Sequence, residues 1–156
     1  MKTFSVIPVL LACCLSAYGQ TDSTGLFEQS KGSWRVPVSR YIRIYNNEEL
    51  KTMHTNLFDS TLRLITDSAF EVKAVHDGIV IAVYDLTDYY AVVTKFGNYS
   101  IVYSGLNKPV CRKGDTIRAG QSFASLMCDH DEGNNWLELK LIKNGRELSA
   151  ASWFDW

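Results

Sequence analysis

Near the C-terminal end of the chain, residues 134–142 read NNWLELKLI and are followed by the hairpin signal Lys143-Asn144-Gly145. Successive side chains of a strand alternate between its two faces, so this stretch predicts one strand with two different faces. Leu137, Leu139 and Leu141 form an apolar row that suits a hydrophobic core. The other face is expected to line a site, and it carries Asn134, Trp136, Glu138 and Lys140.

The composition predicts one folded domain after a polar lead-in. The chain has 156 residues, of which 46% are hydrophobic and 12% aromatic, which is enough for a single core. Residues 20–32 read QTDSTGLFEQSKG, a small and polar composition that predicts a flexible lead-in. We therefore expect the folded domain to cover residues 33–156. Its β-rich runs predict strands at 34–38, 41–45, 61–65, 89–96, 99–106 and 122–128.

The N-terminus has the pattern of a secretory signal. A positive end at Met1-Lys2-Thr3 precedes an apolar run from residue 4 to residue 15, and small residues precede a cut after Gly19. We interpret residues 1–19 as a signal peptide, which predicts export to the periplasm or the extracellular space. The alternative is a loose lipoprotein signal in which Cys13 is acylated and the protein is anchored to a membrane.

The charge balance disfavours one class of partner. Removal of Lys2 with the signal changes the formal charge from −1 to −2. Proteins that bind nucleic acid usually carry a clustered basic surplus, so we expect no nucleic acid partner.

The mature chain would keep two of the four cysteines, Cys111 and Cys128. In an oxidising compartment two such cysteines predict a disulfide, which would stabilise the fold by roughly 3 kcal/mol for a loop of this length. The alternative is a pair of buried free thiols.

Three segments carry a resemblance to a known family. Residues 71–84 read EVKAVHDGIVIAVY, residues 110–124 read VCRKGDTIRAGQSFA, and the strand at 134–142 completes the set. Together they resemble the M23 (lysostaphin or LytM-type) zinc peptidases. The resemblance implies an all-β fold, an antiparallel β-sandwich of the duplicated hybrid (barrel-sandwich) type with little helix. It also implies a tight hairpin turn at Asp77-Gly78, with His76 exposed in that turn.

The same resemblance implies that the catalytic residues are missing. Aligning Glu138 with the family's Glu places Trp136 on a zinc-ligand His and Asn134 on a catalytic His, while Gly105 stands where a second catalytic His belongs. The nearest match to the first metal motif is His54 and Asp59, which are five positions apart instead of four. Tryptophan does not ligate zinc through its indole N–H, and an asparagine amide is no base near neutral pH. We therefore expect a degenerate member with no catalytic residues, no metal and no cofactor.

What remains is a candidate binding cleft. Aromatic side chains at the floor of a cleft are common anchors for partners, although Trp136 could equally plug the empty metal position. The residues assigned to this cleft are Tyr103, Gly105, Asn134, Trp136 and Glu138.

The degenerate LytM proteins, which activate peptidoglycan amidases, show a similar pattern of losses. The resemblance implies an inactive exported domain that acts by binding in peptidoglycan remodelling, with peptidoglycan or a cell-wall amidase or other hydrolase as its partner. One alternative is an active zinc endopeptidase that cleaves peptidoglycan cross-links with His54, Asp59 and a third ligand. The other is an adaptor of the lipoyl or biotinyl hybrid-barrel type, although those domains carry a lysine where this chain has His76.

Overall fold

The fold is built almost entirely from antiparallel strands. The computed structural model describes residues 23–45, 61–68, 70–127 and 135–156. The only helical elements among them are α1 and a short 3-10 turn, η1. The elements are α1 (Ser23–Gln29), β1 (Arg43–Tyr45), β2 (Leu62–Thr66), β3 (Glu71–Lys73), β4 (Gly78–Asp85), β5 (Tyr90–Phe96), β6 (Tyr99–Asn107), β7 (Thr116–Ile117), β8 (Ser122–Leu126), β9 (Asn135–Lys143), β10 (Arg146–Leu148) and η1 (Ala150–Trp153).

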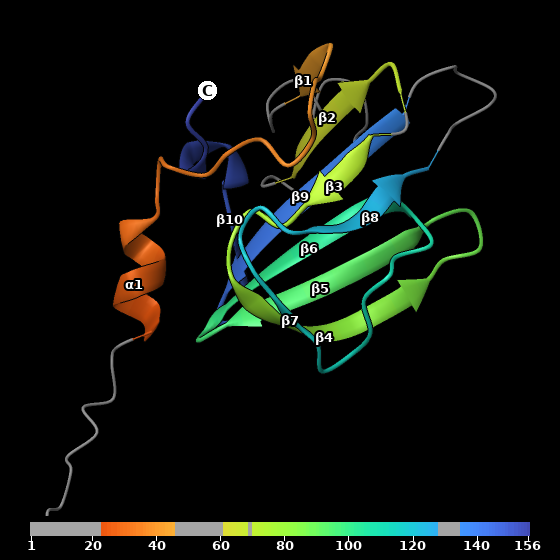
Figure 1. Cartoon of the computed structure of the whole chain (residues 1–156). Coiled ribbons are helices and arrows are strands. Elements are labelled where there is room, and N and C mark those ends of the chain that lie inside the picture. The colour runs from red at the N-terminus through yellow and green to blue at the C-terminus, as the bar shows by residue number, and fades with distance from the viewer. Residues whose placement is uncertain (1–22, 46–60, 69, 128–134) are drawn as a thin grey trace, which may run out of the picture.

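The strands form one large sheet and a smaller layer across it. The main path runs in the order β1-β2-β9-β6-β5-β4-β7, and β10 pairs with β9. β8 pairs with the end of β6 and with β3, so these two strands lie over one face of the large sheet, as Figure 1 shows. Every strand pairing is antiparallel, which confirms the all-β fold class predicted from the sequence.

Strand β9 has the two faces that its sequence predicts. It lies between β2 and β6 near the centre of the sheet, and Leu137, Leu139 and Leu141 are almost fully buried. The chain then turns at Asn144 and Gly145, whose φ angles of 50° and 77° are typical of the two-residue hairpin turn. Arg146 pairs with Lys143, which closes this hairpin.

The core lies between the large sheet and the layer that covers it. Apolar side chains of β2, β6 and β9 meet buried Val72, Phe123 and Leu126 from β3 and β8. Burial of these side chains supplies the main stabilisation of the fold. Trp153 and Phe154 fold back onto this core with 4% and 5% exposure, as expected for terminal aromatics, whereas Trp156 is 52% exposed.

The prediction of a tight hairpin turn at Asp77-Gly78 is wrong. β3 pairs with β8, while β4 pairs with β5 and β7, so residues 74–77 carry the chain from the covering layer to the large sheet. The Asp77 carboxylate accepts a hydrogen bond of 2.8 Å from the Ala119 N–H and fixes this crossover. The predicted strand at 34–38 is also wrong, because it is reduced to a single bridge between Trp34 and Phe154.

From residue 23 onward, the segment predicted to be a flexible lead-in is folded. Helix α1 places Phe27 in full burial, where its ring stacks on Tyr99 with centroids 4.1 Å apart. His76 is half-buried rather than exposed and lies 4.4 Å from the Phe27 ring. The prediction of a flexible lead-in at residues 20–32 is therefore wrong from residue 23 onward, because Phe27, the one aromatic residue of this stretch, packs in the core. No helix among the described residues is long and apolar enough to cross a bilayer.

Candidate functional site on the outer face of the sheet

The outer face of β2, β9 and β6 is the candidate site. Strand pairing aligns Arg63, Glu138 and Ser104 in one row across the three strands, and Ile65 lies opposite Trp136 in the next. All five side chains are partly exposed, in contrast to the buried leucines that alternate with them on β9. The prediction that Trp136 and Glu138 share a face apart from the core is confirmed.

Gly105 and Trp136 fit against each other. Tyr90 pairs with Leu106 and Ala91 with Ser104, so Gly105 is the extra residue of a β-bulge. Its φ of +82° lies in the region that favours glycine. A Cβ on Gly105 would lie 2.4 Å from the Trp136 carbonyl oxygen and 2.6 Å from the ring carbon Cε3. The Trp136 ring therefore occupies the space that any side chain at position 105 would need.

Two further side chains surround the Trp136 ring. The Tyr89 ring meets it edge to face with centroids 5.0 Å apart, and the Arg63 guanidinium lies 5.3 Å from its centroid. Edge-to-face aromatic pairs and cation–π contacts both hold a ring in one orientation. Neither residue was predicted to belong to the site, although the arginine between the leucines of LRLIT is a signal for a charged outer face.

Glu138 is not a free carboxylate. Arg63 donates to Glu138 Oε1 from Nε at 2.9 Å and also from a terminal nitrogen of the guanidinium. The two side chains are only 26% and 14% exposed, so the pair is shielded from solvent. This pairing neutralises the carboxylate and holds the guanidinium beside Trp136.

Tyr103 is not part of this face, contrary to the prediction. It pairs with Leu139, so its ring enters the core, where it is fully buried and lies 5.0 Å from the Phe123 ring. Its hydroxyl accepts a hydrogen bond of 3.1 Å from the Val75 N–H. Burial raises the pKa of Tyr103 well above its ordinary value, so the phenol stays neutral.

Several predicted residues lie outside the described part of the chain. These are Asn134, His54, Asp59 and Cys128, so the remnant metal pair and the disulfide stay predictions. Cys111 is partly buried, and burial raises the pKa of its thiol. Within the described ranges, no three His, Cys, Asp or Glu side chains come together as a metal site would require.

The structure is similar to solved structures that contain the M23 peptidase fold. A structure of Helicobacter pylori Csd3 superposes with a TM-score of 0.62 at 16% identity, covering 80% of this chain and 35% of that one. A chain of the SpoIIIAH and SpoIIQ complex gives a TM-score of 0.62 at 18% identity, covering 76% of this chain and 97% of that one. The M23 metalloprotease pseudoalterin gives 0.53 at 15% identity, covering 74% and 73%.

These likenesses show the fold. The chain has the fold of the M23 peptidases, with tryptophan and glycine at positions where the resemblance expects histidines. It spans about a third of the length of Csd3. No family model and no curated protein matches the sequence.

Proposed function

We propose that this chain is a catalytically inactive, exported M23-like domain that acts by binding in peptidoglycan remodelling. One observation carries the proposal, namely the packing of the Trp136 ring on Gly105. The resemblance assigns a zinc-ligand histidine to position 136 and a catalytic histidine to position 105. The structure fills the first position with an indole and leaves no room for a side chain at the second.

The chemistry of zinc hydrolysis supports the inactive assignment. A catalytic zinc needs three protein ligands, an open position for water and groups that handle protons and developing charge. An indole N–H donates a hydrogen bond and cannot coordinate a cation, and glycine has no side chain to offer. Substitution of Gly105 alone cannot restore the site, because a Cβ there meets the Trp136 backbone as well as its ring.

The outer face has the features of a binding surface. Trp136 and Tyr89 are partly exposed rings held in place by their neighbours, and the ion pair of Arg63 with Glu138 lies beside them. Such anchors bind with little loss of side-chain entropy, since they are already fixed. The partner in this proposal is either peptidoglycan or a cell-wall amidase or other hydrolase that acts on it. The solved SpoIIIAH and SpoIIQ complex supports the use of this fold for protein binding in general.

Export remains part of the proposal. It is supported by the signal pattern of residues 1–19, with a lipid anchor at Cys13 as the alternative arrangement. Either arrangement would place the outer face where the cell wall is.

Binding is tested by pelleting the chain from residue 20 with isolated peptidoglycan, and by measuring muropeptide release by a cell-wall amidase with and without it. We expect at least one of the two assays to respond to the wild type. Trp136→Ala should weaken that response about tenfold or more, as for a central aromatic anchor. Trp156→Ala is the matched control, because Trp156 is exposed but belongs to the C-terminal segment.

Tyr89→Ala guards against a folding artefact, because it removes the edge-to-face contact and leaves the Gly105 packing intact. It should weaken the same response in a protein that unfolds like the wild type. A wild type that neither pellets with peptidoglycan nor changes amidase activity would overturn the binding proposal.

A further inference from the structure

A groove of about 700 Å³ lies on the side of the molecule opposite Trp136. It is lined by residues 33–39, by the crossover that leads from β3 to β4, and by Ala119 and Gly120. Trp136 projects from the outer face of the large sheet, whereas these segments belong to the layer over its inner face. The groove is therefore separate from the candidate site, and its volume lies in the range of ligand sites.

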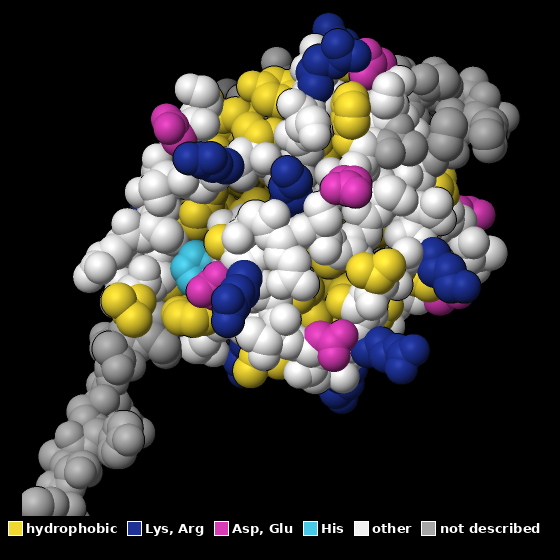
Figure 2. Space-filling model, in the orientation of Figure 1, with side chains coloured by type: hydrophobic (Ala, Val, Ile, Leu, Met, Phe, Trp, Pro, Cys, Tyr) yellow, Lys and Arg dark blue, Asp and Glu magenta, His cyan; other side chains and the backbone are white. Residues whose placement is uncertain are grey.

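The floor of the groove is apolar and fixed. Trp34, Val38, Ala74 and Val75 line it and are buried. The Trp34 indole N–H donates to the Ser30 hydroxyl at 2.9 Å, which holds the ring in place. Figure 2 shows hydrophobic side chains near the histidine on this face, together with an acidic and a basic side chain beside it.

The two walls are tied to each other through the backbone. The Lys73 N–H donates to the Pro37 carbonyl at 2.8 Å, and the Gly120 N–H donates to the Ala74 carbonyl at 2.7 Å. The groove is thus built into the fold rather than formed by one loose segment, so a ligand would meet a prepared surface.

The charged groups that line the groove are all of one sign. Arg35 and Lys73 are exposed, His76 stands beside them, and no Asp or Glu lines the groove. Neither Arg35 nor Lys73 makes an ion pair within the described part of the chain. The Asp77 carboxylate accepts a hydrogen bond from the N–H of Ala119, which lines the groove, and its charge offsets one of these two positive charges. Since the whole chain is slightly acidic, this is a local excess of positive charge.

Two amide N–H groups of the segment that lines the groove have no acceptor among the described residues. The amide N–H groups of Val36 and Val38 donate no hydrogen bond to any residue that the structure describes. Main-chain donors of this kind are typical of sites that bind peptide backbone.

We propose that this groove binds a short acidic peptide. A peptide supplies carbonyl oxygens for the N–H groups of Val36 and Val38, small side chains for the apolar floor and carboxylates for Arg35 and Lys73. An inorganic anion would pair only with Arg35 and Lys73. The inference goes beyond the proposed function and does not depend on Trp136, so the chain would carry two binding surfaces on opposite sides of its sheet.

The test measures the binding of two fluorescein-labelled pentapeptides to the chain from residue 20 by fluorescence anisotropy. One peptide is Ala-Glu-Val-Glu-Ala, amidated at its C-terminus, and the other has glutamine in place of both glutamates. We expect the acidic peptide to bind, with amide NMR shifts at Ala74 and Gly120. Lys73→Gln should weaken binding roughly two- to fivefold, the usual effect of one exposed charge pair, and the double variant with Arg35→Gln should weaken it further.

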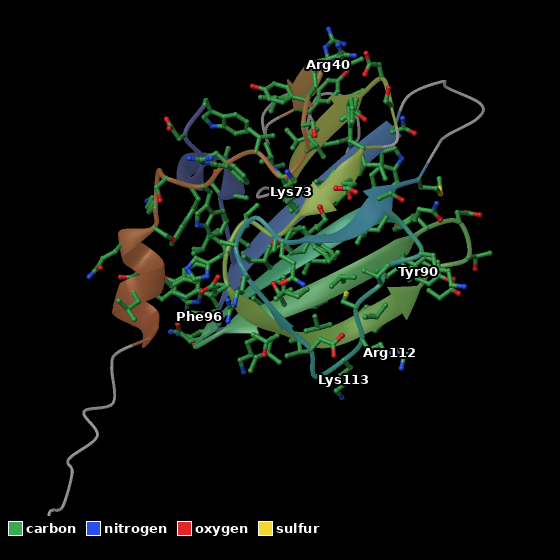
Figure 3. The ribbon with its side chains drawn as sticks, viewed as in Figure 1. Arg40, Lys73, Tyr90, Phe96, Arg112 and Lys113 are labelled. Atoms are coloured by element: carbon green, nitrogen blue, oxygen red, sulfur yellow. The ribbon has the colours of Figure 1, made fainter. Side chains whose placement is uncertain are left out.

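Lys113→Gln is the matched control, because Lys113 is exposed, does not line the groove and lies at the lower edge of the molecule in Figure 3, away from Lys73. It should leave binding unchanged, as should Trp136→Ala. The proposal is overturned if the acidic peptide does not bind, if the glutamine peptide binds equally well, or if Lys113→Gln weakens binding as much as Lys73→Gln does. None of these results would affect the proposed function of the outer face, because that function is tested through Trp136.

Discussion

At the scale of single residues, Gly105 and Trp136 depend on each other. Gly105 adopts a left-handed backbone at a β-bulge, and this allows the Trp136 backbone and ring to lie directly against it. Any side chain at position 105 would therefore meet both the backbone and the ring of Trp136.

Gly105→Ala tests this dependence. The substitution adds backbone strain and a clash with the Trp136 carbonyl, so we expect it to lower the free energy of unfolding by about 3 kcal/mol. Gly145→Ala is the control, because Gly145 has a similar φ of +77° and nothing within 4 Å of its Cβ position. That variant should lose only about 1 kcal/mol. If the two variants lose the same free energy of unfolding in urea, the contact between the added Cβ and Trp136 costs no stability.

The residues of the site were only partly predictable. Strand alternation correctly placed Trp136 and Glu138 on the outer face, because β9 is regular from Asn135 to Lys143. It could not place Tyr103 relative to Gly105, because the bulge shifts the register between them. Strand alternation also could not predict the ion pair between Arg63 and Glu138, because the two residues lie 75 positions apart in the sequence.

At the scale of elements, helix α1 is the largest departure from the prediction. Its sequence is short and polar, and a helix of this length is unstable alone. It forms because Phe27 docks among rings contributed by β6 and η1, Tyr99 and Trp153. Tertiary contacts of this kind leave no local pattern in the sequence. Figure 3 shows Phe96 close to this helix as well.

Phe27→Ala should therefore destabilise the domain by about 3 kcal/mol, as for a buried aromatic side chain. Leu26→Ala is the matched control, since Leu26 is the preceding residue of the same helix and is 49% exposed. Urea unfolding of both variants measures the difference. If Phe27→Ala unfolds like Leu26→Ala, the helix is not part of the folded unit and the original prediction of a flexible lead-in was right.

At the scale of the whole molecule, the fold class was predictable because it depends on repeated local signals. Gly114 and Gly120, for example, stand at turns with φ angles of +99° and +79°, in the region that favours glycine. The crossover from β3 to β4 was not predictable, since a turn signal does not say which strand a segment pairs with. The result is a sheet with one aromatic outer face and, on the other side, a covering layer with a basic groove.

The proposed function requires that this domain, despite its M23-type fold, does not hydrolyse peptidoglycan. The most direct measurement is zinc content together with muropeptide release from peptidoglycan, made on one purified sample of residues 20–156. We expect no bound zinc and no release of muropeptides. One zinc per chain together with cleavage of the wall would contradict it, and His54 and Asp59 would then be the first residues to substitute.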